Sequence, residues 1–156
     1  MERVIDGRIP LPDPCAEEQA LHAFYAAFNG RDLAAMARCW LQDDEASLAN
    51  PLGGLRRGWA QLAPLYQALF DGPARVYVAF HDYTLHRCGE GFVAVGRERG
   101  HFERDGVSLA LAIRTSRVFR RHQGEWRQLH HHGSIEDAAL LARYQSAVFG
   151  GRGAPV

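Results

Sequence analysis

Apolar positions in the first half of the chain repeat with helical spacing. Within residues 16–29 they recur at i, i+3, i+4 and i+7, which gives a helix one apolar stripe. The same spacing follows Asp32, a good helix N-cap, and returns in a third segment. Pro64 lies inside that third segment, so this helix must start late or bend there. The elements expected in this half are helices over residues 16–29, 33–40 and 59–70, with a short strand over 45–50.

From residue 75 onwards the pattern changes to alternation with period two, which is typical of strands that bury one face. An Asp-Gly pair at 105–106 and a Gln-Gly pair at 123–124 favour tight hairpins between them. The expected strands are residues 75–87, 92–104, 107–121 and 125–134. Ser134 can cap a final helix that reaches residue 149. Helices on one side of an antiparallel meander make an α+β fold.

The two ends of the chain differ from the middle. Prolines at positions 10, 12 and 14 exclude a helix and predict an extended arm over residues 1–14. Such an arm is either a loose tail or a segment that packs on a partner subunit. Residues 150–156 are rich in glycine and predict a disordered tail. With 156 residues in all, we expect one domain over residues 15–149.

Composition and charge argue against several classes of function. Lys+Arg and Asp+Glu number 18 each, so no net charge favours nucleic acid or an anionic membrane as a partner. We find no apolar run of membrane-spanning length and no signal-peptide pattern. The three cysteines are widely spaced without a C-x-x-C motif, which predicts neither a disulfide framework nor a zinc site. A reducing, cytoplasmic setting is therefore expected.

The strand over residues 125–134 carries the most conspicuous polar side chains. Simple alternation puts Arg127, Leu129 and His131 on one face and, on the other, Trp126, Gln128, His130, His132 and Ser134. The second face is either the wall of a ligand pocket or a wet edge strand. His130 and His132 lack an apparent third ligand, so neither a metal nor another cofactor is predicted. Both are either structural hydrogen-bonding groups or, for His130, a pocket acid/base.

Three blocks of sequence resemble the nuclear transport factor 2-like superfamily, which includes ketosteroid isomerases, SnoaL-like polyketide cyclases and the association (hub) domain of calmodulin-dependent kinases. The blocks are AFYAAFNGRDLAAM (23–36), DDEASLANPLGG (43–54) with Gly58, and RVFRRHQGEWRQLHHHGS (117–134). The last is most similar to the hub pattern. The resemblance covers about residues 17–135. It implies a cone of strongly curved antiparallel sheet wrapped by the N-terminal helices, with a pocket inside and the C-terminal helix added.

The resemblance also implies which residues a ketosteroid isomerase would need. Its carboxylate base matches Asn50, and an amide is no base at neutral pH. Its oxyanion tyrosine falls on Phe24, with Tyr25 one residue off register. The expected strand aspartate falls among residues 114–117, which contain no acid. The isomerase pattern is therefore missing, and whether the chain is an enzyme stays open.

Arginines stand where acids were expected. Arg117 and either Arg97 or Arg99 match the two strands that carry pocket arginines in hub domains. A guanidinium in a partly dry pocket favours a carboxylate, whereas on the wet face it would only bind solvent or a neighbouring acid. The predicted ligand-binding residues are Asn50, Tyr66, Arg97, Arg99, Arg117, His130 and His132.

The sequence thus predicts a SnoaL-like domain that binds an amphipathic, carboxylate-bearing small molecule. One alternative is a cofactor-free isomerase, dehydratase or cyclase in which His130 replaces the aspartate base. Another is a hub-like assembly module. We expect a homodimer, because the outer face of such a sheet commonly needs cover.

Overall fold

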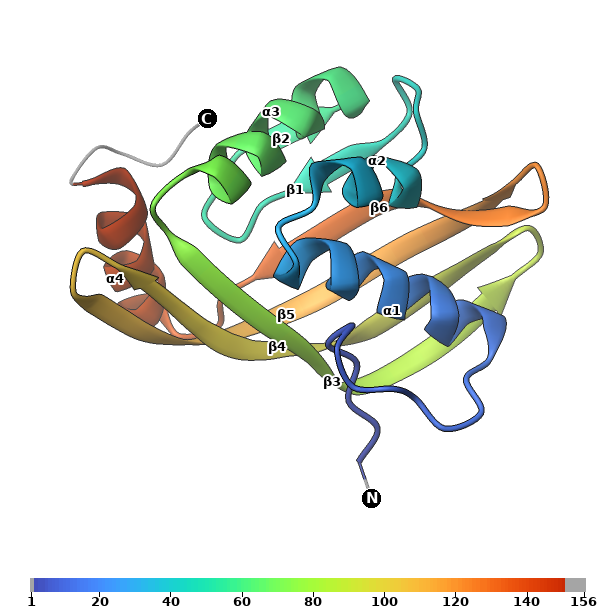
Figure 1. Ribbon diagram of the computed structural model, residues 1–156, viewed down its shortest axis with the longest axis horizontal. Helices are drawn as coiled ribbons and strands as arrows, with labels where there is room; N and C mark the ends of the chain where they lie inside the picture. Colours follow the sequence, from blue (N-terminus) through green and yellow to red (C-terminus); the bar gives the residue numbers. More distant parts are fainter. Residues whose placement is uncertain (1, 151–156) are drawn as a thin grey trace.

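In the computed structural model, which describes residues 2–150, four helices and six strands form one α+β unit (Figure 1). The elements in chain order are α1 (Ala16–Asn29), α2 (Leu33–Cys39), β1 (Ser47–Ala49), β2 (Leu55–Arg57), α3 (Trp59–Asp71), β3 (Arg75–Cys88), β4 (Gly91–Arg104), β5 (Val107–His122), β6 (Glu125–Ser134) and α4 (Ala138–Phe149). The predicted fold class is confirmed. The short strand β2 was not predicted, because the glycines before it indicated only a break.

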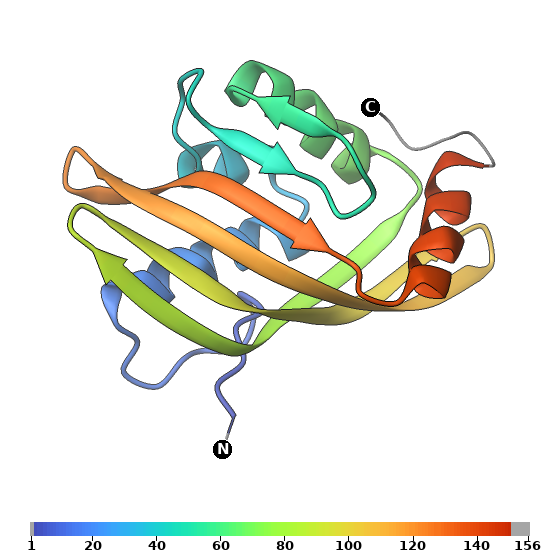
Figure 2. The same cartoon turned by 180° about the vertical axis from the view of Figure 1, so that it is seen from behind.

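The six strands form one curved, open sheet in the order β2-β1-β6-β5-β4-β3. Neighbouring strands are antiparallel except β1 and β6, which are parallel. The helices α1, α2 and α3 lie on the concave side of the sheet (Figure 1), and the rear view shows the outer face that they leave open (Figure 2). The helix α4 lies at one end, beside the β4–β5 hairpin (Figures 1 and 2).

Tight turns join the long strands as the sequence predicted. Asp105 and Gly106 have φ values of 50° and 79°, and Gln123 and Gly124 have 52° and 79°. Two successive residues at positive φ suit the right-handed twist of a two-residue hairpin. These turns fix the register of β4, β5 and β6, and hence which side chains point inward.

The N-terminal arm packs on its own chain. Ile5 is fully buried and exchanges two backbone hydrogen bonds with Phe80 of β3, at 3.0 and 2.8 Å. The Asn29 amide donates to the carbonyls of Asp6 and Val78, both at 2.8 Å, which ties arm, helix and sheet together. The interpretation of the arm as a loose tail is therefore wrong. The predicted C-terminal tail lies outside the described residues from residue 151 onwards.

Two helix ends differ from expectation. The helix α3 begins at Trp59 and continues through the exposed Pro64, so a late start is wrong. Asp137, rather than Ser134, caps α4, because its Oδ1 accepts from the backbone N–H groups of the first turn.

No helix among the described residues combines the length and apolar character needed to span a membrane. The sulfur atoms of the cysteines form no disulfide within that range, and the cytoplasmic setting predicted from cysteine usage stays a prediction.

Candidate functional site

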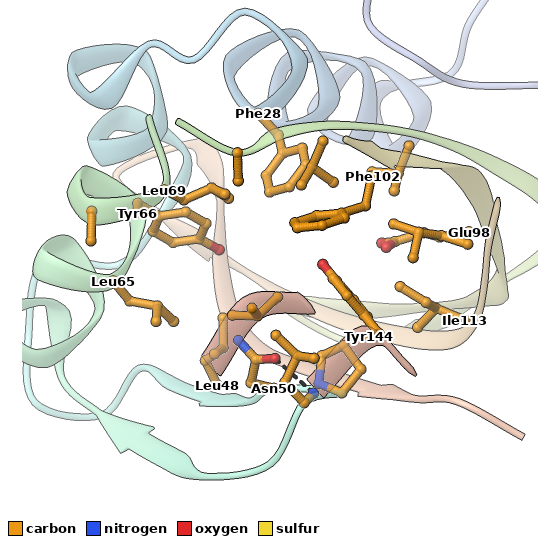
Figure 3. Close-up of a pocket in the computed structure, with 18 of the residues that line it drawn as sticks. Phe28, Leu48, Asn50, Leu65, Tyr66, Leu69, Glu98, Phe102, Ile113 and Tyr144 are labelled. Carbon is orange, nitrogen blue, oxygen red and sulfur yellow. Dashed lines mark hydrogen bonds between the residues drawn. The ribbon is translucent and has the colours of Figure 1, made fainter. Parts of the chain in front are cut away.

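A cavity of about 440 Å³ lies between the concave face of the sheet and the helices α1, α3 and α4 (Figure 3). We call it the central cavity. Inward positions of β4 and β5 form one wall, because alternate residues of a strand point to the same side. The apolar lining includes Phe28, Leu48, Leu65, Leu69, Phe102 and Ile113. A space of this size with such walls can hold a small organic molecule.

Four polar side chains form a network at the wall of the cavity, and we call Tyr25, Glu98, Arg117 and Gln128 the buried polar cluster. Glu98 and Arg117 are only 4% and 2% exposed. Arg117 Nη2 and the Tyr25 hydroxyl donate to the same oxygen, Glu98 Oε1, at 2.6 and 2.8 Å. Arg117 also donates to the Tyr25 hydroxyl at 3.1 Å and to Gln128 Oε1 at 2.8 Å. The guanidinium further lies 3.8 Å from the ring centre of Phe24.

Within the buried polar cluster, the carboxylate of Glu98 balances the positive charge of Arg117. Burial alone would lower the pKa of Arg117, but Tyr25 and Glu98 raise it above its ordinary value. Burial is also the main cause that raises the pKa of Tyr25 well above 10. The tyrosine therefore remains a neutral donor, while Glu98 balances the guanidinium inside the protein. Arg117 is thus no free cation for a ligand.

His131 adds a neutral imidazole to the same lining. Burial, and then the nearby Arg117, lower the pKa of His131 well below 6.5. Its Nε2 atom is buried and has no hydrogen-bond partner among residues 2–150. A buried ring nitrogen without a partner is rare in a folded protein, so it marks a place where a ligand or water can bind.

Three further polar groups reach the cavity. The hydroxyls of Tyr66 and Tyr144 point into it from α3 and α4 (Figure 3). Burial raises the pKa of Tyr144 to about 12, so its hydroxyl is protonated at neutral pH. Asn50 follows β1, and its Oδ1 accepts from the Leu52 N–H at 2.9 Å (Figure 3). This turn occupies the oxygen of the amide and leaves its NH₂ group for a ligand.

Three of the residues predicted from sequence, Asn50, Tyr66 and Arg117, line the central cavity. Arg97 and Arg99 do not, because the inward position between them on β4 belongs to Glu98. Both arginines are exposed on the outer face. Their predicted place in the pocket is therefore wrong.

His130 and His132 are also on the outer face, for a different reason. Val118 pairs with His130 and Phe119 with Gln128, so Leu129 is an extra residue in β6. Such a bulge reverses the alternation beyond it. Gln128 therefore faces inward before the bulge and His131 after it, and the predicted pocket positions of His130 and His132 are wrong. His130 Nδ1 instead lies 2.7 Å from Ser47 Oγ of β1.

Sequence reasoning missed Glu98, His131 and Tyr144. For Glu98 a signal existed: Ala94, Glu98 and Phe102 share one face of β4, and an acid between apolar residues on an inward face needs a partner. No comparable signal identified His131, because the bulge that turns it inward depends on pairing with β5.

Comparisons with known proteins agree on the fold. A family model for the SnoaL-like domain matches residues 18–138. The F-box protein SKIP8 of Arabidopsis thaliana is 25% identical over 115 residues, which span 72% of this chain but only 46% of that protein. The chain thus spans about half the length of this relative.

Two solved structures extend the comparison. One, from Thiobacillus denitrificans, is assigned as a calcium/calmodulin-dependent protein kinase type II association domain; it is 26% identical, with a TM-score of 0.67 over 81% of this chain and 100% of that one. The other, from Streptomyces avermitilis, belongs to the nuclear transport factor 2-like family and is assigned as a dehydratase. It is 19% identical, with a TM-score of 0.72 over 79% of this chain and 95% of that one, and it shows the fold alone.

Proposed function

Because the chain belongs to the SnoaL-like domain family, we propose that it binds an amphipathic small molecule in its central cavity. One observation carries this proposal: an apolar space of about 440 Å³ is lined by the neutralised pair of Glu98 and Arg117 together with the unpaired His131 Nε2. Apolar walls with a few fixed polar groups are the usual make-up of a ligand site. The walls would take the apolar body of the ligand.

The carboxylate predicted for this ligand needs a partner other than Arg117. Glu98 already occupies the Arg117 guanidinium at 2.6 Å, and a second carboxylate beside it would meet repulsion in a medium of low dielectric constant. A hydroxyl, carbonyl or apolar end fits the region near the cluster better, since it brings no charge there.

A filled cavity tests the proposal. Leu65 lies in the lining on α3, so Leu65→Trp should occupy the space and remove ligand-induced stabilisation. Gln67→Trp adds the same ring to the same helix at an exposed position outside the lining, and it serves as the matched control. The measurement is the shift of Tm with a panel of amphipathic acids, alcohols and ketones. The proposal fails if no compound stabilises the wild type, or if both variants respond like it.

Glu98 favours a second candidate function, proton transfer in the cavity. Its Oε1 is held by Tyr25 and Arg117, while Oε2 forms no hydrogen bond with the described residues. A fixed carboxylate with one open oxygen can act as a general base. In this proposal Glu98 takes the role that the sequence assigned to His130, in an isomerase, dehydratase or cyclase.

Deuterium exchange tests this second candidate. Wild-type protein in D₂O should catalyse deuterium incorporation into an enolisable ketone, followed by NMR, and Glu98→Gln should abolish it. The variant keeps the shape of the side chain and removes its basicity, and its circular dichroism spectrum must match that of the wild type because Arg117 loses its charge partner. An exchange rate equal to that of buffer alone for the wild type would eliminate proton transfer without affecting the binding proposal.

The outer face of the sheet supports self-association. The likeness to an association domain favours it, and Val95, 41% exposed, lies on this face. We therefore propose a homodimer through the outer face. Val95→Glu should yield a monomer in size-exclusion chromatography with light scattering, whereas Val107→Glu at a hairpin end should not. A wild-type monomer at micromolar concentration would overturn the dimer.

A further inference from the structure

Two arginines besides Arg117 belong to the lining of the central cavity, and both are partly exposed, so they mark where the lining meets water. Arg56 comes from β2 and Arg104 from the last position of β4. Both are partly exposed, whereas Arg117 is 2% exposed. We call Arg56 and Arg104 the mouth arginines. The cavity is therefore neutral inside and positively charged where it meets water.

The charge at the mouth lacks a strong internal partner. Within residues 2–150, no acid lies at ion-pair distance from Arg56. Arg104 Nε is 3.3 Å from the carboxylate of the next residue, Asp105, which is 79% exposed. An exposed pair of this kind is weak and exchanges readily with solvent. Among the described residues, Glu98 is the single acid of the lining, and Arg117 already pairs with it.

This arrangement fixes the direction in which an amphipathic molecule can bind. A charged group placed beside Glu98 would lose its hydration next to a like charge. At the mouth the same group keeps part of its water and gains charge-assisted hydrogen bonds from guanidinium groups. The apolar body then lies against the inner walls, where its burial is favourable.

We infer that the central cavity takes amphipathic anions with the apolar end inward and the anionic group at the mouth, where Arg56 or Arg104 donates to it. This inference rests on the proposed binding function and adds the class and orientation of the ligand. It also gives the predicted carboxylate a partner, because the guanidinium groups of Arg56 and Arg104 are accessible to solvent and that of Arg117 is not.

Octanoate and 1-octanol are suitable probes, since they share an apolar chain and differ in the charge of the head. Binding of each is measured by calorimetry on the full chain. The double variant Arg56→Gln/Arg104→Gln should bind octanoate about tenfold more weakly than the wild type, the size expected for a lost charge-assisted hydrogen bond. Its affinity for 1-octanol should change less than about twofold, the spread seen for surface substitutions. The control is Arg57→Gln/Arg99→Gln, on the same two strands but outside the lining.

The orientation of bound octanoate is measured separately, by NMR titration of octanoate labelled with ¹³C at its carboxyl group. A head at the mouth should titrate with a pKa below that of free octanoate, because the mouth arginines favour the ionised form. A head beside Glu98 would titrate above the free value. That result overturns the inference, and so does an equal loss of affinity for octanoate in the double variant and in its control. If neither probe binds the wild type, the binding proposal itself fails and the inference with it.

Discussion

Arg117 Nη2 lies 2.6 Å from Glu98 Oε1, and this ion pair joins the neighbouring strands β5 and β4 inside the protein. Removing one partner leaves the other charge buried alone. We therefore expect Arg117→Met to lower the free energy of unfolding by about 3–5 kcal/mol, and Glu98→Leu similarly. The double variant should recover much of that loss because no buried charge remains. Urea denaturation of the four proteins measures this cycle.

Arg99→Met is the matched control for the ion pair, since it makes the same change on the exposed outer face of β4. Surface substitutions of this kind change stability by less than about 0.5 kcal/mol. An Arg117→Met variant as stable as Arg99→Met would show that the pair does not carry its charges in solution.

The sequence predicted the fold better than the site, for a physical reason. Hairpins depend on local turn chemistry, and the turn at Asp105 and Gly106 can be recognised in the sequence from these two residues alone. Which face of β6 points inward depends on one extra residue, Leu129, whose bulge forms against β5. Alternation alone therefore placed His130 in the pocket and left His131 out. Glu98 lies between two exposed arginines, so the most conspicuous charges of β4 belong to the face that points away from the cavity.

Arg31 connects the turn between α1 and α2 with the end of α3. Its guanidinium donates to the carbonyls of Leu69, Phe70, Gly72 and Ala74, at 2.6 to 3.0 Å. These carbonyls lie at or beyond the last turn of α3, where a cation is favourable. Arg31→Met should destabilise the protein by at least about 2 kcal/mol, because several acceptors lose a charged donor.

Arg31→Lys gives the sharper comparison for this contact. An ammonium group is a point donor and cannot reach carbonyls spread around a planar fork. We expect Lys to restore less than half of the stability lost in Arg31→Met, as measured by urea denaturation. Full restoration would mean that charge alone, without the fork geometry, stabilises the end of α3.

Gly7 holds the N-terminal arm against α1. Its φ is +77°, and a Cβ there would lie 2.0 Å from the backbone nitrogen of Ala26. Gly124 has φ +79° but no atom within 4 Å of such a Cβ, so it isolates the effect of φ. Both alanine variants should lose about 1–2 kcal/mol from the left-handed conformation. Gly7→Ala should lose a further 1–3 kcal/mol or so from overpacking, and equal losses would show that the arm is not packed there.

His131 makes stability depend on pH with a sign that the structure defines. The folded state holds its pKa well below 6.5, so below that pH the unfolded chain binds a proton that the folded protein does not. The contribution of the neutral ring is therefore complete above pH 6.5 and is lost as pH falls. One such proton changes the free energy of unfolding by about 1.4 kcal/mol per pH unit.

Replacing the imidazole removes this slope. His131→Gln stays neutral throughout, so between pH 6.5 and 5.5 it should lose about 1 kcal/mol less stability than the wild type, because the unfolded histidine is only half protonated at the start of that interval. His132→Gln removes an imidazole from the exposed outer face of the same strand and is the matched control. Denaturant unfolding at closely spaced pH values measures all three proteins, and the acids common to them cancel in the differences. Parallel curves for wild type and His131→Gln would mean that the ring accepts its proton in the folded state, where the unpaired Nε2 is already in contact with water.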